Sequence, residues 1–269
     1  MWSKEKETLD EFVDKLPTEA LIHLLGGQPN TGVANTFGMG NLPEYGIPNI
    51  MTADGPAGLR IQPQCGVNTT AWPCATLLAC TWDPELIEEI GKAGGEEVKE
   101  NNIGIWLTPA VNIHRSPLCG RNFEYFSEDP FLTGVCACAI TKGVQENHQV
   151  LVCPKHFAVN EQETYRRGNA KKQYDAVDSV ITERAARELY LKPFEMLVKK
   201  ANVRCIMTSF NKINGIFAGG NSDLCNRILR EEWGYEGFLV TDWGIWILWW
   251  MARMQLRPEM MLSCPAGRR

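Results

Sequence analysis

Residues 237–243 read Gly237-Phe238-Leu239-Val240-Thr241-Asp242-Trp243, an apolar run that leads into an acidic residue and then an aromatic one. The run has the length and composition of a short buried strand. Enzymes built on α/β barrels carry their catalytic groups at the carboxyl ends of the strands. Asp242 is therefore a candidate nucleophile, with Trp243 as an apolar platform beside it. A strand-ending aspartate more often caps a loop or a helix, so other segments must support this interpretation.

Outward from this stretch, short apolar runs alternate with amphipathic segments that carry helix start signals, such as Asp83 before Pro84 and Thr182 before Glu183. Such alternation predicts an α/β fold with a parallel sheet, closed or open. About seven strand–helix units would make most of a barrel. The Gly-, Asn- and Pro-rich residues 28–45 are predicted to form a long ordered loop. The predicted strands are residues 49–52, 104–108, 150–153, 204–207 and 238–240.

Composition excludes several classes of protein. A length of 269 residues fits a single barrel, and a net charge of −5 without a basic run argues against a nucleic-acid partner. No stretch is apolar and long enough to span a membrane, and the charged N-terminus is unlike a signal peptide. The ten cysteines are scattered without a CxxC pair, which is a poor zinc or disulfide pattern. We therefore expect reduced, mostly buried thiols in a cytoplasmic protein.

Polar clusters follow the other predicted strands. Asp54 comes directly after residues 49–52, and a Gly-Pro turn then directs its side chain outward; an Asx-turn role is equally compatible. Arg121 lies in a loop that also holds Glu124 and Glu128. Its guanidinium suits the hydroxyl groups of a polyol, and an ion pair with one of the two glutamates is the competing interpretation.

Two further clusters complete the set. Lys155 and His156 follow residues 150–153, where one side chain can enter a barrel mouth while the other braces a loop. Met207 and Phe210 can line an apolar pocket or belong to the core. The sequence shows no metal-ligand spacing, phosphate loop, nucleophile elbow or dinucleotide fingerprint, so neither a metal nor a cofactor is expected. Many hydroxyl-binding groups beside aromatic rings suit a small carbohydrate.

Taken together, these segments resemble the catalytic barrel domain of glycoside hydrolase family 3, the β-glucosidase group, over residues 18–246. The resemblance implies a (β/α)8 TIM-barrel-like domain over residues 1–246 and retaining hydrolysis through a glycosyl-enzyme on Asp242. It also implies that Asp54, Arg121, Lys155 and His156 hold sugar hydroxyls and that Met207, Phe210 and Trp243 line the subsite. The matching motifs are Ala53-Asp54-Gly55-Pro56, Gly120-Arg121-Asn122-Phe123-Glu124, Lys155-His156-Phe157, Met207-Thr208-Ser209-Phe210-Asn211 and Thr241-Asp242-Trp243.

The sequence departs from the family at the general acid/base. In the family this residue usually lies on a separate αβα domain, for which 269 residues leave no room. A minority branch uses a loop histidine, but the Gly-His pattern of that branch does not follow Lys155-His156. Glu161 and Glu163 are nearby carboxylates without a motif that gives them the role. We therefore expect the acid/base to be missing and an αβα domain to be the missing partner.

The tail, residues 247–269, is the second departure. The resemblance stops after Trp246 and no later strand is recognisable, so the eighth strand is expected to be absent and the sheet edge open. Codons for residues 249–267, read one base earlier, can encode VDGKDAAEAGNDVKLPGG, whose last ten residues resemble the family's eighth strand. We hypothesise that the natural reading frame was lost near residue 247.

Two alternatives stay open. One is a catalytically weak or inactive sugar-binding fragment that lacks its acid/base domain. The other is an unrelated α/β barrel such as a small-molecule lyase, which a late phosphate-binding glycine loop would favour; the sequence contains none. The identity of the sugar is not fixed by these motifs.

Overall fold

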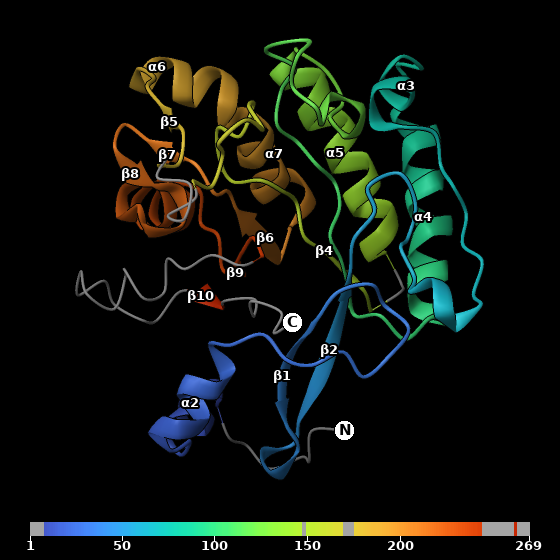
Figure 1. The fold of residues 1–269 in the computed structure, drawn as a ribbon, viewed down its shortest axis with the longest axis vertical. Helices are drawn as coiled ribbons and strands as arrows, with labels where there is room; N and C mark the ends of the chain where they lie inside the picture. Colours follow the sequence, from blue (N-terminus) through green and yellow to red (C-terminus); the bar gives the residue numbers. More distant parts are fainter. Residues whose placement is uncertain (1–7, 147–148, 169–174, 244–260, 263–269) are drawn as a thin grey trace.

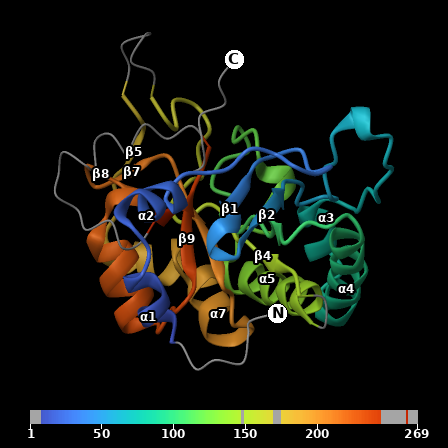
Figure 2. The same cartoon turned by 90° about the horizontal axis from the view of Figure 1, so that it is seen from below.

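Parallel strands lie at the centre of the molecule, and helices α4, α5 and α7 lie side by side outside them (Figures 1 and 2). The computed structural model describes residues 8–146, 149–168, 175–243 and 261–262. The helices are α1 (Leu9–Asp14), α2 (Thr18–Leu24), α3 (Ala75–Ala79), α4 (Pro84–Glu100), α5 (Pro130–Gln145), α6 (Glu183–Ala185) and α7 (Lys192–Ala201), with π-helical segments at Ala186–Tyr190 and Asp223–Glu232. The strands are β1 (Gly38–Leu42), β2 (Ile47–Ala53), β3 (Ile105–Trp106), β4 (Leu151–Val152), β5 (Asp178–Ser179), β6 (Cys205–Thr208), β7 (Lys212–Ile213), β8 (Ile216–Phe217), β9 (Phe238–Thr241) and β10 (Met261–Leu262).

The segment after β4 joins two parallel sheets. Strands β2, β3 and β4 form one of them, and β6, β9 and β10 form the other. The backbone N–H of Met207 donates to the carbonyl of Pro154 at 2.9 Å, and that of Phe157 donates to the carbonyl of Met207 at 2.7 Å. The carboxyl ends of these strands therefore share one edge, which is where a parallel α/β fold places its ligand.

The five predicted strands are all present, as β2, β3, β4, β6 and β9. The closed barrel is only partly reproduced, because in the described part of the chain β1 and β10 end the strand order without pairing with each other. Strand β1 corrects the prediction of a loop over residues 28–45: Gly38–Leu42 pairs antiparallel with β2. Tertiary pairing here overrides a glycine-rich sequence of low strand propensity.

The tail also needs one correction. No strand was expected after Trp246, yet Met261–Leu262 pairs in parallel with Leu239 and Val240 of β9. This short strand falls within residues 249–267, the stretch whose shifted frame resembles the family's eighth strand. The rest of the tail, and with it most of the frame hypothesis, lies outside the described residues.

The two longest helices, α4 and α5, each begin at an aspartate that caps the first turn. Asp83 accepts a hydrogen bond from the N–H of Leu86 at 3.0 Å at the start of α4, and Asp129 accepts one from Phe131 at 2.7 Å at the start of α5. The helical segment that starts after Thr182, as its start signal predicts, is divided into α6, a π-helical turn and α7. None of the described helices combines the length and apolarity that a bilayer crossing requires.

Helices α4 and α5 cross in close contact because two glycines face each other. A Cβ atom on Gly143 would lie 2.1 Å from the carbonyl oxygen of Glu88, and one on Gly91 would lie 2.6 Å from that of Ile140. Real side chains do not approach backbone that closely, so only glycine permits this packing distance.

The strands are buried on both faces, as expected for a parallel sheet covered by helices. Ile105, Cys205 and Val240 belong to a cluster on the inner side of the strands. Trp106, Ile206 and Leu239, each one residue away, belong to the larger core that includes residues of the outer helices. This alternation follows the two-residue period of a strand, and it directs alternate side chains toward the enclosed side.

Candidate active site

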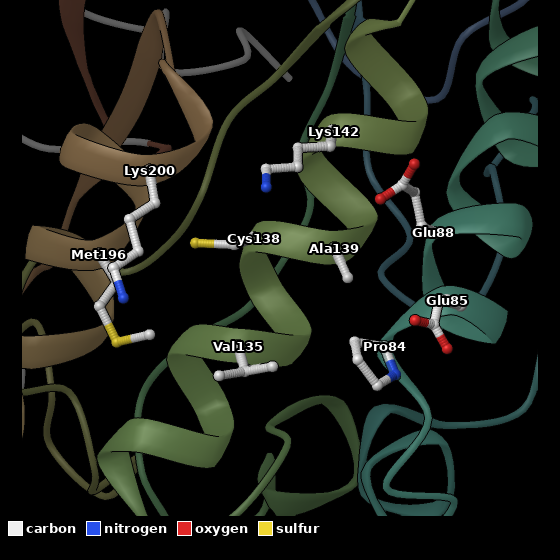
Figure 3. Close-up of a pocket in the computed structure, with 9 residues that line it drawn as sticks. All are labelled: Pro84, Glu85, Glu88, Val135, Cys138, Ala139, Lys142, Met196 and Lys200. Carbon is white, nitrogen blue, oxygen red and sulfur yellow. The ribbon is translucent and has the colours of Figure 1, made fainter.

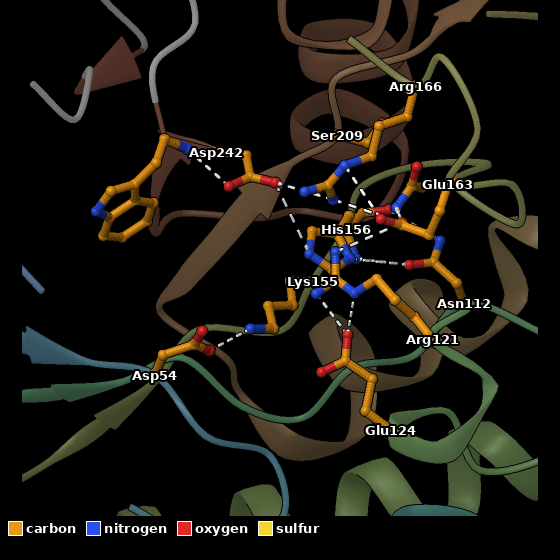
Figure 4. A network of polar contacts seen from close by, with 12 residues as sticks. Asp54, Asn112, Arg121, Glu124, Lys155, His156, Glu163, Arg166, Ser209 and Asp242 are labelled. Carbon is orange, nitrogen blue, oxygen red and sulfur yellow. Dashed lines mark hydrogen bonds and ion pairs between the residues drawn. The ribbon is translucent and has the colours of Figure 1, made fainter. Parts of the chain in front are cut away.

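The predicted site residues converge at the carboxyl ends of the parallel strands (Figure 4). Asp54 follows β2, Lys155 and His156 follow β4, and Asp242 follows β9. Arg121 comes from the loop between β3 and α5, beside the short 3-10 turn Asn122–Glu124. The structure thus brings together polar groups that lie up to about two hundred residues apart in the sequence, on strand ends that the sheet holds at one edge.

Asp54 and Lys155 form a close ion pair. Lys155 Nζ lies 2.5 Å from Asp54 Oδ1, and Lys155 is only 3% exposed. Burial alone raises the pKa of Asp54, but the charge and hydrogen bond of Lys155, with the N–H of Gly55, outweigh it and hold the pKa below its usual value. Gly55 donates to Asp54 Oδ1 at 2.9 Å, so the turn role and the site role coexist. This carboxylate stays ionised at neutral pH and can accept hydroxyl hydrogen bonds.

Asp242 is held more loosely. Its Oδ2 lies 3.6 Å from a guanidinium nitrogen of Arg166 and 3.9 Å from His156 Nε2, and its Oδ1 accepts the N–H of Trp243 at 2.6 Å. Burial raises the pKa of Asp242 above its usual value, although Arg166 and Lys155 oppose the shift. The side chain is 13% exposed, so the carboxylate is accessible at the edge of the site.

Arg121 makes the ion pair that competed with a site role. Its Nε donates to Glu124 Oε1 at 2.5 Å, and its NH1 lies 3.6 Å from Glu163 Oε1. Burial by itself would lower the pKa of Arg121, but Tyr125, Glu124 and Glu163 raise it above its usual value. All three guanidinium nitrogens contact Glu124 or Glu163 (Figure 4), so the ion pair is present and the hydroxyl-binding role stays a prediction.

His156 is neutral rather than an ion-pair partner of Asp242. It is 1% exposed, and burial together with Arg121, Lys155 and Arg166 lowers its pKa well below the usual value. The ring therefore offers hydrogen bonds and no charge at neutral pH.

The apolar candidates differ in position. Met207 is 2% exposed and belongs to the inner cluster, so the core interpretation holds for it. Phe210 is buried with the Arg166 guanidinium 4.8 Å above its ring, which makes it a support for a cation. Trp243 is partly buried and packs against the inner cluster, next to Asp242.

Sequence reasoning missed Arg166, and it left Glu163 without a role. The NH1 atom of Arg166 lies 3.6 Å from Asp242 Oδ2 and 3.5 Å from Glu163 Oε1, and its Nε lies 3.2 Å from Glu163 Oε2. One guanidinium therefore holds two carboxylates. Both residues follow Lys155-His156 without an intervening helix or strand, and a loop extending from a barrel strand end is the signal that would have identified them.

The described residues contain no group of three or more His, Cys, Asp or Glu side chains arranged to hold a metal. A separate hollow of ≈ 300 Å³ lies on the helix side, between α4, α5 and α7 (Figure 3). It takes no residue from the strand ends, so it is distinct from the polar site. The chemistry available at the strand ends is that of two partly exposed carboxylates, Asp54 and Asp242, beside cations and hydrogen-bonding groups.

We compared the chain with known protein families, sequences and structures. Residues 39–263 match the glycosyl hydrolase family 3 N terminal domain. Beta-glucosidase A of Butyrivibrio fibrisolvens is 56% identical over 238 residues, which is 88% of this chain and 28% of that protein. The structure of beta-glucosidase 3B from Thermotoga neapolitana in complex with alpha-D-glucose superimposes with a TM-score of 0.81 at 44% identity, covering 88% of this chain and 34% of that one.

A beta-glucosidase from Paenibacillus barengoltzii gives a TM-score of 0.79 at 45% identity, over 88% of this chain and 25% of that one. The chain thus spans between a quarter and about a third of the proteins it matches. The family match extends over most of the chain and includes the strand ends that carry Asp54, Lys155, His156 and Asp242. This chain belongs to glycoside hydrolase family 3, within the region that corresponds to the family's N-terminal domain.

Proposed function

We propose that this chain forms the sugar-binding and nucleophile-bearing part of a retaining β-glucosidase. The observation that carries the proposal is Asp242, an accessible carboxylate at the end of β9, 3.6 Å from Arg166 and 3.9 Å from His156. The beta-glucosidases among its relatives support glucose, or a sugar of the same hydroxyl pattern, as the substrate. Because the chain belongs to glycoside hydrolase family 3, the alternative of an unrelated α/β barrel such as a lyase is abandoned.

In the first step Asp242 would attack the anomeric carbon, forming a carbon–oxygen bond as the bond to the leaving oxygen breaks. The leaving oxygen needs a proton from an acid unless it leaves as a stable anion. Water then attacks the glycosyl-enzyme and releases Asp242. Asp54, Lys155, Arg121 and His156 would hold the sugar hydroxyls, with Trp243 beside the ring.

Arg166 has a defined part in this scheme. A cation 3.6 Å from Oδ2 stabilises the carboxylate without forming the short hydrogen bond that would reduce its nucleophilicity. Glu163 holds Arg166 from the opposite side, so the guanidinium does not close onto Asp242.

The acid is the missing element of the described site. Glu163 shares a guanidinium nitrogen with Asp242, but it is paired with both Arg121 and Arg166. Glu163 Oε1 contacts both Arg121 and Arg166, and its Oε2 contacts Arg166, so neither oxygen is free to reach a leaving group. We infer that the acid/base comes from outside the described residues, on a separate αβα domain.

The second candidate function is sugar binding with little or no turnover. The observation that favours it is that Glu163, the carboxylate that shares Arg166 with Asp242, has its oxygens engaged by two arginines. Loss of a general acid costs about 10²–10⁴-fold in rate. The two candidates differ in turnover and in covalent chemistry, and they share sugar binding.

A mechanism-based label tests the nucleophile without needing an acid. A 2-deoxy-2-fluoro β-glucoside with a dinitrophenolate leaving group should form a stable adduct on the peptide that contains Asp242, detected by mass spectrometry. Asp242→Ala should take up no label, and Asp83→Ala, which removes an aspartate at a helix cap, should be labelled like the parent. Sugar binding without any adduct would favour the binding fragment, and an adduct on another residue would refute the assignment of Asp242.

We further propose that the parallel strands belong to a (β/α)8 barrel over residues 1–246 and that residues 247–269 are read in a shifted frame. The barrel is supported by the parallel pairing of β2, β3 and β4 and of β6 and β9. The frame hypothesis rests on the resemblance of the alternative frame to an eighth strand. Resequencing the gene tests the frame. Independent reads that reproduce the present frame would remove a sequencing error as the cause.

A further inference from the structure

Asn112 lies behind His156 and contacts both its backbone and its ring. Its side-chain oxygen accepts the backbone N–H of His156 at 2.9 Å and faces the ring nitrogen Nδ1 at 3.2 Å. Its amide nitrogen donates to the carbonyl of His156 at 3.1 Å and to Glu161 Oε1 at 3.4 Å. Asn112 is 1% exposed, so solvent does not compete for these hydrogen bonds.

The orientation of this amide follows from its partners. The backbone N–H of His156 can only donate, so it requires the oxygen of Asn112. The carbonyl of His156 and the carboxyl of Glu161 accept, so they require the NH₂ group. A rotated amide would set its NH₂ group against the backbone N–H of His156 and its oxygen against the two acceptors, which would leave several buried groups unsatisfied.

This orientation determines where the imidazole carries its proton. An amide oxygen 3.2 Å from Nδ1 can only accept, so Nδ1 must be the protonated nitrogen. In a neutral ring the other nitrogen, Nε2, is then an acceptor. Nε2 lies 3.9 Å from Asp242 Oδ2, so two acceptors face each other and cannot hydrogen-bond to one another.

We infer that Asn112 is a positioning residue that fixes the Nδ1–H tautomer of His156, so that the site presents Nε2 and Asp242 Oδ2 as paired acceptors for a hydroxyl donor. The tautomer assignment stands on the contacts alone. Its consequence for substrate, that a ligand must donate a hydroxyl proton at this position, rests on the proposed function. A fluoro or methoxy group at the same carbon can only accept and will not replace the hydroxyl.

The direct test is ¹⁵N NMR of the imidazole nitrogens at neutral pH, which distinguishes protonated from unprotonated ring nitrogens. The chain has four histidines, and the His156 signals are identified by their loss in His156→Gln. We expect Nδ1 protonated and Nε2 unprotonated in the parent chain. An Nε2-protonated ring there would overturn the inference.

Three variants separate positioning from general packing. Asn112→Ala should release the ring to a tautomer mixture, and Asn112→Asp, which keeps the acceptor, should retain Nδ1–H. Asn211→Ala removes another buried amide at the strand ends, one that donates to the carbonyls of Ala158 and Lys212, and should leave the His156 tautomer unchanged. Near-ultraviolet circular dichroism verifies that each variant is folded. An unchanged tautomer in folded Asn112→Ala refutes the role; should that variant not fold, Asn112→Asp decides, and loss of Nδ1–H there refutes it.

A ligand series tests the consequence. Calorimetric titration with glucose and its singly deoxygenated and singly fluorinated forms should identify one hydroxyl whose loss weakens binding on the order of tenfold and which fluorine does not restore. In Asn112→Ala the difference between that hydroxyl and fluorine should shrink. Full restoration by fluorine at every position would refute an acceptor pair. No binding of any sugar would remove the proposed function and leave the NMR result standing.

Discussion

Asp54 and Asp242 end two strands of the same sheet, yet their surroundings give them opposite properties. Asp54 touches a buried ammonium group at 2.5 Å, and its pKa lies below the usual value. Asp242 has cationic and imidazole nitrogens only at 3.6 and 3.9 Å, and its pKa lies above the usual value. Direct contact with a cation makes a permanent anion that orients a ligand. More distant cations leave the pKa of Asp242 above its usual value and its Oδ2 atom without a close ion pair.

The largest expected difference between the two carboxylates is in turnover. On an aryl β-glucoside, whose leaving group needs little acid assistance, Asp242→Ala should lose about 10³-fold or more in kcat. Asp54→Ala should act mainly through KM, because it removes binding that ground state and transition state share. Steady-state kinetics over a range of substrate concentrations separates the two. Equal losses in kcat for both variants would contradict the division of roles.

The second largest effect should be on stability, because Lys155 contacts Asp54 and not Asp242. Lys155→Met removes the buried counter-ion of Asp54 and leaves only the exposed Arg60 beside it, and we expect a loss of roughly 1–3 kcal/mol in the free energy of unfolding. Arg60→Met is the matched control, since Arg60 contacts the same carboxylate at 3.4 Å with a side chain that is 55% exposed. It should change stability by less than about 0.5 kcal/mol. Urea unfolding measures both, and similar losses would show that the ammonium contact is not special.

Neutralising each carboxylate should shift stability in opposite directions. The pKa of Asp54 is depressed by folding, so its charge stabilises the native state above the unfolded pKa, and this contribution is lost as the pH falls through the folded pKa. The pKa of Asp242 is raised, so its charge opposes folding as the pH rises above the unfolded value. At neutral pH, Asp54→Asn should therefore lower and Asp242→Asn should raise the free energy of unfolding, each on the order of 1 kcal/mol.

Thermal unfolding at neutral pH and near pH 3 measures this contrast. Each difference should shrink as the pH falls through the folded pKa of its carboxyl, first for Asp242 and at lower pH for Asp54. A stabilising Asp54→Asn would mean that burial outweighs the contact with Lys155.

The smallest effect concerns Glu163, which keeps Arg166 away from Asp242. Glu163→Gln should let the guanidinium move toward Asp242 and lower its pKa. The acidic limb of the pH profile for kcat/KM should then move to lower pH by less than about one pH unit. Glu188→Gln, on an exposed ion pair with Arg184, is the control and should leave the profile in place. A shift to higher pH would contradict the restraining role of Glu163.

Most of the strands and of the residues at their ends could be predicted, because the signal lies in short stretches of sequence. Strands β4, β6 and β9 are short, mainly apolar runs, and β2 ends in the buried residues Met51-Thr52-Ala53. The polar residues that follow these strands are visible in the sequence. The site residues Asp54, Lys155, His156 and Asp242 followed from that rule together with a family resemblance.

What could not be predicted depends on distance in the chain. The contact of Asp54 with Lys155 joins residues 101 positions apart, and no local pattern encodes it. Arg166 and Glu163 lie in an irregular segment, where hydrophobic periodicity carries no signal. Strand β1 was missed because Gly38 and Gly40 disfavour a strand, and pairing with β2 determines its structure instead.

The glycine contact between α4 and α5 has a practical consequence for engineering. Because Gly143 leaves no room for a Cβ, the two helices form a fixed frame, and α5 anchors the far end of the loop that begins after β3. In that loop Asn112 is held by His156 and Arg121 is held by Glu124. Leu118, which lies between them in the sequence, is 92% exposed. Libraries that vary the exposed residues around Leu118 should therefore be tolerated by the fold, whereas substitutions at Gly91 and Gly143 should be left out of them.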